Sequence, residues 1–192
     1  MDSTISFLSL LACALYFMLP AYLANVSALA FGGGAPVDLK KNFQDGRRLL
    51  GDGVTWRGTI IGVLIGTGIA AIQGIVFMHY GDIFTLIPGW VSIEGLIPNN
   101  FDKWILLGLA LSAGALLGDA VGSFIKRRIN IERGKPAPFL DQLDFVIGAL
   151  VLASLVVTIP LDVIILILIF TVILHVAANT IAYLLGLKDV WY

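Results

Sequence analysis

Charged residues are scarce in this sequence: Asp, Glu, Lys and Arg make up 13% of its 192 residues, against about 25% in a typical soluble domain. Hydrophobic residues make up 58%, and the mean hydropathy is +0.95. This composition excludes an ordinary soluble domain and indicates an integral membrane protein. The formal net charge of -1 does not by itself indicate a class of partner, and we expect no nucleic-acid partner.

Cysteine is almost absent as well. Cys13 is alone in the chain, which excludes an internal disulfide and any CxxC or Cys/His metal pattern. A hard metal bound by oxygen ligands stays open, whereas zinc, which prefers nitrogen and sulfur ligands, is disfavoured.

Five apolar runs have about the length that an α-helix needs to cross roughly 30 Å of hydrocarbon. We expect transmembrane helices at about 5–27, 58–80, 104–125, 142–159 and 161–186. The first is interpreted as a retained helix because Met1 to Ser6 contain no Lys or Arg and the run is too long for a signal peptide. Only Pro160 separates the last two runs, which predicts a tight hairpin. The prediction is an all-α bundle forming one transmembrane domain over residues 1–192.

The positive charges predict how the bundle lies in the membrane. Ten of the twelve basic residues fall in residues 31–57 and 126–144. By the positive-inside rule, these two loops are cytoplasmic, the N-terminus lies outside, and the C-terminus is cytoplasmic. Small residues at every fourth position also predict close helix packing; they are Gly58, Gly62, Gly66, Ala70 and Gly74 in the second run, and Gly114, Gly118 and Gly122 in the third.

Asp119 lies within the third apolar run, where a carboxylate facing lipid would cost a few kcal/mol. It is therefore expected to face protein, water or an ion. If the helix continues through residue 126, Asp119, Ser123 and Lys126 share one face. A carboxylate and an ammonium two turns apart could hold a metal and the phosphate bound to it.

Asp141 and Asp144 stand three positions apart at the start of the fourth run. Two interpretations are open: they cap the helix and complement its dipole, or they bind a metal together with Asp119. Three carboxylates would suit Mg²⁺, which takes a few carboxylates, water and substrate phosphate.

The loop at residues 31–57 mixes glycines with Lys, Arg and Thr, which can bind phosphate oxygens. It contains no Walker A motif, and a basic cytoplasmic loop also serves as an orientation signal and lipid-headgroup contact. His175 and Asn179, one turn apart in the last run, are expected to form interhelical hydrogen bonds.

Motifs along nearly the whole chain resemble the CDP-archaeol synthase family, membrane CTP:lipid-phosphate cytidylyltransferases that are distantly similar to phosphatidate cytidylyltransferases. They are Pro20, Tyr22 and Asn25, then "GGGAPVD", "GRRLLGDGVTWRG", "GDAVGSFIKRR", "PAPFLDQLDF" and "HVAANTIAYLLGLKDV". The S-x-x-K-R segment followed by D-x-x-D is the most specific part.

This resemblance implies an Mg²⁺-dependent enzyme at the cytoplasmic face of the cell membrane. It would transfer CMP from CTP to an unsaturated archaeal ether-lipid phosphate, 2,3-bis-O-geranylgeranylglycerol 1-phosphate, giving CDP-archaeol and pyrophosphate. The implied site residues are metal ligands Asp119, Asp141 and Asp144, phosphate-binding Lys126 and Arg127, and nucleotide-pocket candidates Asn25, Asp38, Thr55 and Arg57.

One position departs from the family pattern: Val54 stands where a lysine is expected before the threonine. Arg57 or Lys41 could supply that phosphate contact instead. Two other functions stay open. A CDP-alcohol phosphotransferase would need a long DGxxAR…GxxxDxxxD pattern that the sequence lacks, and a small transporter would need polar residues continuing across the bilayer.

Overall fold

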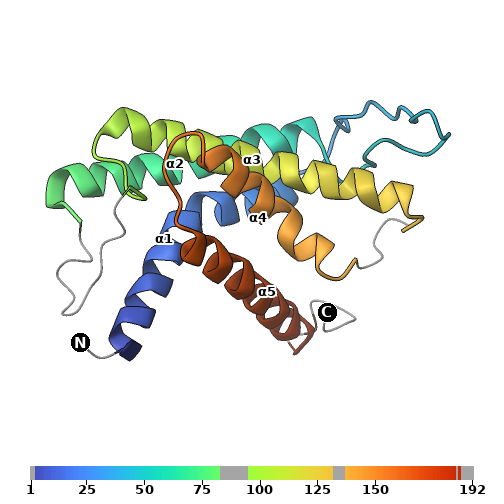
Figure 1. The fold of residues 1–192 in the computed structure, drawn as a ribbon. Helices are drawn as coiled ribbons and strands as arrows, with labels where there is room; N and C mark the ends of the chain where they lie inside the picture. Colours follow the sequence, from blue (N-terminus) through green and yellow to red (C-terminus); the bar gives the residue numbers. More distant parts are fainter. Residues whose placement is uncertain (1–2, 83–94, 132–136, 185, 187–192) are drawn as a thin grey trace.

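The computed structural model describes residues 3–82, 95–131, 137–184 and 186, and it is helical throughout its regular elements. Five helices follow one another along the chain (Figure 1). They are α1 (Ser3–Ala30), α2 (Trp56–Tyr80), α3 (Phe101–Arg128), α4 (Leu140–Ala153) and α5 (Leu161–Leu184). The predicted helices at 5–27, 58–80, 104–125 and 161–186 therefore have observed counterparts whose ends differ by at most three residues.

Four of these helices are long and apolar enough to cross a membrane: Phe7–Ala30, Trp56–Tyr80, Phe101–Arg128 and Leu161–Ile181. The protein is therefore a multi-pass membrane protein. The predicted span at 142–159 is wrong in its extent, because α4 ends at Ala153 and its 14 residues reach about 21 Å. Residues 154–160 connect α4 to α5, so the prediction that Pro160 alone separates these two helices is also wrong.

Side-chain caps define where α2 and α3 begin. Thr55 accepts a hydrogen bond from the Gly58 backbone N–H at 3.2 Å, and Asn100 accepts one from Lys103 at 3.0 Å. Each satisfies one backbone donor that the first helical turn leaves free. In α1 the helix contains Pro20, which removes one backbone hydrogen bond, and Figure 1 shows α1 bent along its length.

The α3 helix lies at the centre of the bundle and packs against α1, α2 and α4, while α5 packs against α4 and α1 (Figure 1). Close approach depends on glycine. A Cβ added at Gly66 would lie 2.6 Å from Ser112 Cβ of α3, and one at Gly114 would lie 2.9 Å from the Ala149 Cα of α4. The prediction that small residues mediate helix packing is confirmed at these positions.

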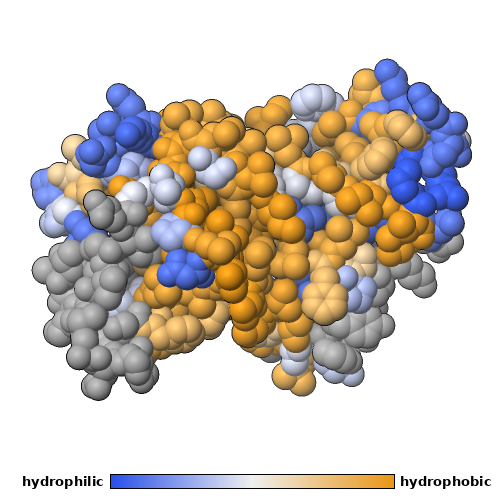
Figure 2. All heavy atoms as spheres, viewed as in Figure 1, coloured by the Kyte–Doolittle hydropathy of each residue, from blue (hydrophilic) through white to orange (hydrophobic). Residues whose placement is uncertain are grey.

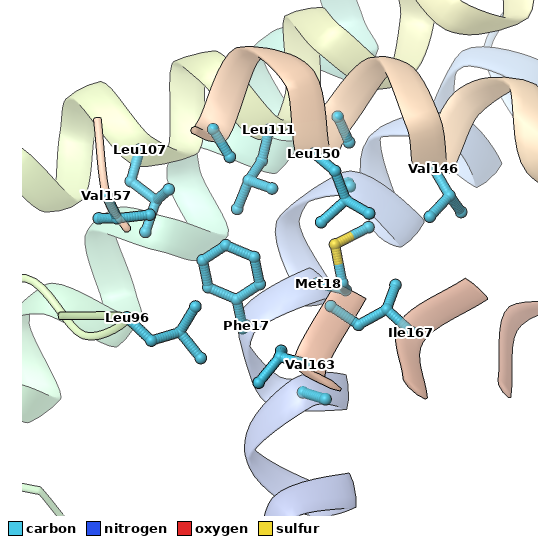
Figure 3. Close-up of a cluster of buried hydrophobic side chains, with 14 of the residues drawn as sticks. Phe17, Met18, Leu96, Leu107, Leu111, Val146, Leu150, Val157, Val163 and Ile167 are labelled. Atoms are coloured by element: carbon cyan, nitrogen blue, oxygen red, sulfur yellow. The ribbon is translucent and has the colours of Figure 1, made fainter. Parts of the chain in front are cut away.

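A continuous apolar core joins four of the helices. Figure 3 shows Phe17 and Met18 of α1 among side chains from α3, α4 and α5. Their neighbours in this view include Leu107, Leu111, Val146, Leu150, Val163 and Ile167. Burial of these side chains fixes α4 and α5 against α1 and α3, although α4 is short.

The surface is banded. In Figure 2 apolar residues cover the middle of the molecule, and hydrophilic residues gather beyond the two ends of α2 and α3. One hydrophilic region belongs to the loop between α1 and α2, which lies beside the C-terminal end of α3. This band is the surface expected of helices that cross a bilayer.

Candidate functional site

The loop between α1 and α2 is organised around Asp38, whose side chain is fully buried. Its carboxylate accepts hydrogen bonds from Arg48 Nε at 3.2 Å and Nη2 at 2.9 Å. It also accepts the backbone N–H groups of Lys40, Leu50 and Gly51 at 3.0 to 3.1 Å. Gly51 has φ +106°, a conformation that favours glycine, and this turn aims its N–H at Asp38.

The charge state of Asp38 follows from these contacts. Burial alone would raise the pKa of the carboxyl group, but the hydrogen bonds from Arg48 and from the backbone N–H groups outweigh it and hold the pKa well below its usual range. Asp38 is therefore ionised at neutral pH and fixes the loop from within.

Lys126 and Asp141 connect the end of α3 with the start of α4. Lys126 Nζ lies 2.8 Å from Asp141 Oδ1, and both side chains are largely shielded from solvent. The second oxygen of Asp141 accepts the Ala137 backbone N–H at 2.9 Å. Asp141 thus holds the chain segment that leads into α4 as well as the ammonium group.

Asp144 lies against the backbone of α3 between Gly118 and Gly122. A Cβ added at Gly122 would lie 2.8 Å from the Asp144 Cγ, so only glycine leaves room for this carboxylate. Its Oδ1 accepts the Phe145 N–H at 2.7 Å. Its Oδ2 is buried and has no hydrogen-bond partner among the described residues, which is costly for a carboxylate oxygen.

The three aspartates and Lys126 form one electrostatic group. The charge of Asp144 interacts with those of Asp119, Lys126 and Asp141, and Asp119 interacts with Lys126 and Asp141. Two carboxylates close together in a low-dielectric site repel each other. The charges of Asp119 and Asp144 oppose each other in this way.

A cavity of about 610 Å³ opens between α1, α2, α3 and α5. Asp119 lines it from α3, Asn25 from α1, and Thr55 from the start of α2. On its other side lie Thr171, Leu174, His175, Ala178 and Asn179 of α5. The Tyr22 hydroxyl and Thr171 Oγ1, both in the wall, are 2.8 Å apart and link α1 to α5.

Comparisons with known proteins show the family of this chain. A family model described as CarS-like, CDP-archaeol synthase, matches residues 7–192. A CDP-archaeol synthase from Methanocaldococcus jannaschii is 55% identical over 186 residues, covering 97% of this chain and 99% of the relative. One from Methanothermobacter thermautotrophicus is 54% identical over 178 residues, covering 93% and 92%. The chain belongs to the CDP-archaeol synthase family.

A solved structure of an intramembrane enzyme for archaeal membrane lipids biosynthesis has the same fold, with a TM-score of 0.68 and 37% sequence identity. The similarity covers 86% of this chain and 92% of the solved one. Membership of the CDP-archaeol synthase family, expected from the sequence motifs, is thus confirmed, and with it the character of the protein as a membrane enzyme.

The candidate residues of this CDP-archaeol synthase family member do not all occupy the same place. Asn25, Thr55 and Asp119 line the cavity. Asp141, Asp144 and Lys126 surround the adjoining contact between α3 and α4. Arg127 donates a hydrogen bond to the Ile131 carbonyl oxygen at 2.7 Å, which holds it beside the same helix end.

Two candidates are placed differently from the predicted nucleotide contacts. The Asp38 carboxylate is taken up by Arg48 and three backbone donors, so it supports the loop and offers no free oxygen to a ligand. Arg57 is exposed in the first turn of α2 and is not among the residues that line the cavity. Val54, which stands where the family pattern predicts lysine, lies in the cavity wall.

Sequence reasoning missed Thr59 and Thr171 as cavity residues, and expected interhelical hydrogen bonds as the main role of His175 and Asn179. His175 and Asn179 also line the cavity. The signal available in the sequence was their four-residue spacing with Thr171, which places all three on one face of α5.

The site can be probed through the glycine that accommodates Asp144. Gly122→Ala is expected to push the Asp144 side chain away from α3, lowering the midpoint of thermal unfolding in detergent and removing activity. The loss of stability should be about 1–3 kcal/mol, as for other overpacked contacts. Gly68→Ala is the matched control, because a Cβ at Gly68 of α2 meets nothing within 4 Å. Equal unfolding midpoints for the two variants would contradict the packing of Asp144 on Gly122.

Proposed function

We propose that the protein transfers CMP from CTP to 2,3-bis-O-geranylgeranylglycerol 1-phosphate, giving CDP-archaeol and pyrophosphate. The observation that carries this proposal is the cavity between α1, α2, α3 and α5, which combines Asp119 with polar and apolar walls. CDP-archaeol synthase relatives with 40–55% identity over nearly the whole chain support the same reaction.

The cavity wall suits substrates of two kinds. Val26, Leu29 and Leu174 provide apolar surface, whereas Asn25, Thr55 and Thr59 provide hydrogen-bonding groups. An ether-lipid phosphate needs both, because its isoprenoid chains stay in the hydrocarbon while its phosphate must meet a water-soluble nucleotide. We propose that the two substrates meet at the cytoplasmic face. The basic loop between α1 and α2 lies beside the C-terminal end of α3, and basic loops of membrane proteins are mostly cytoplasmic.

In the proposed reaction, an oxygen of the lipid phosphate attacks the α-phosphorus of CTP. The new P–O bond forms as the bond to the bridging oxygen breaks, and the electron pair leaves with pyrophosphate. The attacking oxygen is already ionised at neutral pH, so the step requires no general base and no covalent enzyme intermediate. Charge neutralisation and alignment are therefore the main tasks of the protein.

Lys126 and Arg127 are the cations proposed to neutralise phosphate. Lys126 is held by Asp141 in the structure, which orients its ammonium group at the C-terminal end of α3, the helix that also carries Asp119. Asn25 and Thr55 line the cavity near the same end of the bundle and can donate hydrogen bonds to substrate oxygens.

A bound Mg²⁺ is also part of the proposal. Within the described residues no three His, Cys, Asp or Glu side chains gather closely enough to hold a metal by themselves. The fit is nonetheless good for Mg²⁺, which commonly uses one or two carboxylates together with substrate phosphates and water. The unpartnered Asp144 Oδ2 and the neighbouring Asp119 would hold it, with Asp141 as the third candidate ligand. When bound, the ion would neutralise and align the triphosphate.

A direct experiment measures pyrophosphate release by the purified protein with CTP, Mg²⁺ and the geranylgeranyl ether phosphate. We expect release of pyrophosphate together with formation of a CDP-lipid, and none when the lipid phosphate is omitted. Absence of turnover would contradict the proposal. Release of CMP from a supplied CDP-lipid would instead support a CDP-alcohol phosphotransferase, and uptake into proteoliposomes without nucleotide turnover would support a transporter.

A further inference from the structure

We infer that Arg128 is a positioning residue that clamps the loop between α1 and α2 onto the end of α3 and so prepares the nucleotide pocket. The inference deepens the proposed function, on which its kinetic test rests. Arg128 itself does not line the cavity, so the role assigned to it is indirect.

The Arg128 side chain is surrounded by the loop. Its Nη1 lies 2.7 Å from Asp45 Oδ1, and its Nη2 donates to the Arg48 carbonyl oxygen at 2.5 Å. The guanidinium group also lies over two rings, 5.0 Å from the centroid of Phe43 and 4.6 Å from that of Phe124. Only 19% of the side chain is exposed, so these charge-assisted contacts are stronger than those of a free surface arginine.

A second set of contacts has its hydrogen-bond donor in the loop and its acceptor in α3. Arg47 Nη1 donates to the Arg128 carbonyl oxygen at 2.5 Å. The Phe43 and Phe124 rings meet edge to face with their centroids 5.4 Å apart. Loop residues 43–48 and α3 residues 124–128 are therefore joined by an ion pair, by hydrogen bonds from arginine side chains to backbone carbonyl oxygens, and by an aromatic contact.

The loop does not need this clamp to keep its own shape. Asp38 ties residues 40, 48, 50 and 51 together from within, and isolated β-bridges join Pro36 to Thr55 and Asn42 to Arg48. The contacts of Arg128 instead fix where this preformed loop lies relative to α3. Their loss should shift the loop away from α3 and let the hydrogen bonds of residues 41–49 open more often, without unfolding the helices.

The position of the loop matters because it contributes to the pocket. Gly53, Val54 and Thr55 at its end line the same cavity as Asp119 of α3. Gly51 also lies close to Arg127, since a Cβ added there would be 3.7 Å from Arg127 Nε. The clamp thus holds the phosphate-binding candidates of the loop and of α3 in one arrangement.

The expected kinetic signature is a raised KM for CTP with a nearly unchanged kcat. Without the clamp, only a fraction of molecules would have the loop in its binding position, and apparent affinity falls in proportion to that fraction. Arg128→Gln should therefore raise the KM for CTP about tenfold, while the KM for the lipid phosphate and kcat change by less than about threefold.

Three further variants make the experiment specific. Asp45→Asn should raise the KM for CTP in the same direction, and combined with Arg128→Gln it should add little, because both remove one contact. Arg128→Lys keeps the charge and should recover part of the affinity. Asp52→Asn is the matched control: Asp52 forms an ion pair with Arg48 within the loop, at 2.9 Å, and is 47% exposed.

Hydrogen exchange supplies a readout that does not depend on catalysis. In the ligand-free protein, amides of residues 41–49 should exchange faster in Arg128→Gln than in the wild type, whereas amides of α2 and α3 should not. Unchanged exchange in this segment, or a fall in kcat without a change in the KM for CTP, would overturn the inference. If the wild type fails to use CTP, the proposed function falls, but the exchange experiment still decides whether Arg128 clamps the loop.

Discussion

Asp144→Asn is expected to abolish detectable CDP-lipid formation while leaving the protein folded and at least as stable as the wild type. The Asp144 Oδ2 is buried without a hydrogen-bond partner among the described residues, and the carboxylate interacts unfavourably with Asp119. Removing that charge relieves repulsion and desolvation. It also removes the group proposed to hold Mg²⁺, so kcat/KM should fall by about 10²- to 10³-fold or more.

The measurement pairs steady-state pyrophosphate release with thermal unfolding in the same detergent. Asp162→Asn is the matched control, because Asp162 lies in the exposed first turn of α5, and it should leave both quantities unchanged. Activity and stability should move in different directions in Asp144→Asn. Substantial turnover by this variant would remove Asp144 from the metal site, and a large fall in its unfolding midpoint would show that the carboxylate is structural.

Most of the helical framework could be predicted from the sequence because long apolar runs are a strong signal. Helix α3, for example, was expected at 104–125 and occupies Phe101–Arg128. The extent of α4 could not be predicted in this way, because residues 154–159 remain mostly apolar after the helix ends. There the Leu155 and Val156 N–H groups bond to carbonyls three residues back, and Ser154 Oγ donates to the Val151 carbonyl oxygen. These three-residue hydrogen bonds form a tighter turn than the α-helix and end it, although the hydropathy of the sequence does not change.

The candidate site was predictable where a charge stands in an apolar setting. Asp119 and Asp144 drew attention for that reason, and the structure brings their charges into interaction. Asp38 illustrates the limit. Its position in a glycine-rich basic loop suggests ligand binding, but only the folded loop shows that Arg48 and three backbone donors occupy its carboxylate.

The cavity could not be predicted from local sequence motifs, because it is formed by residues far apart in the chain. Tyr22 and Thr171, which meet in its wall, are 149 positions apart in the chain. Their contact depends on how α1 and α5 pack, and no periodicity within either helix encodes that partner. Local sequence patterns therefore predict the charged residues of the candidate site, whereas the apolar and hydroxyl-bearing residues of the cavity wall could be identified only from the structure.

Lys126→Met is expected to lower kcat/KM for CTP by about 10²-fold, the range found when one positioned donor to a transition-state oxyanion is removed. Lys126 Nζ lies 2.8 Å from Asp141 Oδ1, so part of the result depends on whether the two residues act together. Lys103→Met is the matched control on the same helix, since Lys103 is exposed in the first turn of α3 at the opposite end, and it should retain full activity.

The pair can be separated by a double-mutant cycle with Asp141→Asn. If Asp141 acts by orienting Lys126, the variant with both changes should be no less active than Lys126→Met alone, because residues that act as a unit are not additive. If Asp141 also serves as a metal ligand, the double variant should lose a further large factor, and Asp141→Asn alone should require more Mg²⁺ for half-maximal rate. Full activity in Lys126→Met would contradict its phosphate-binding role, whichever result Asp141→Asn gives.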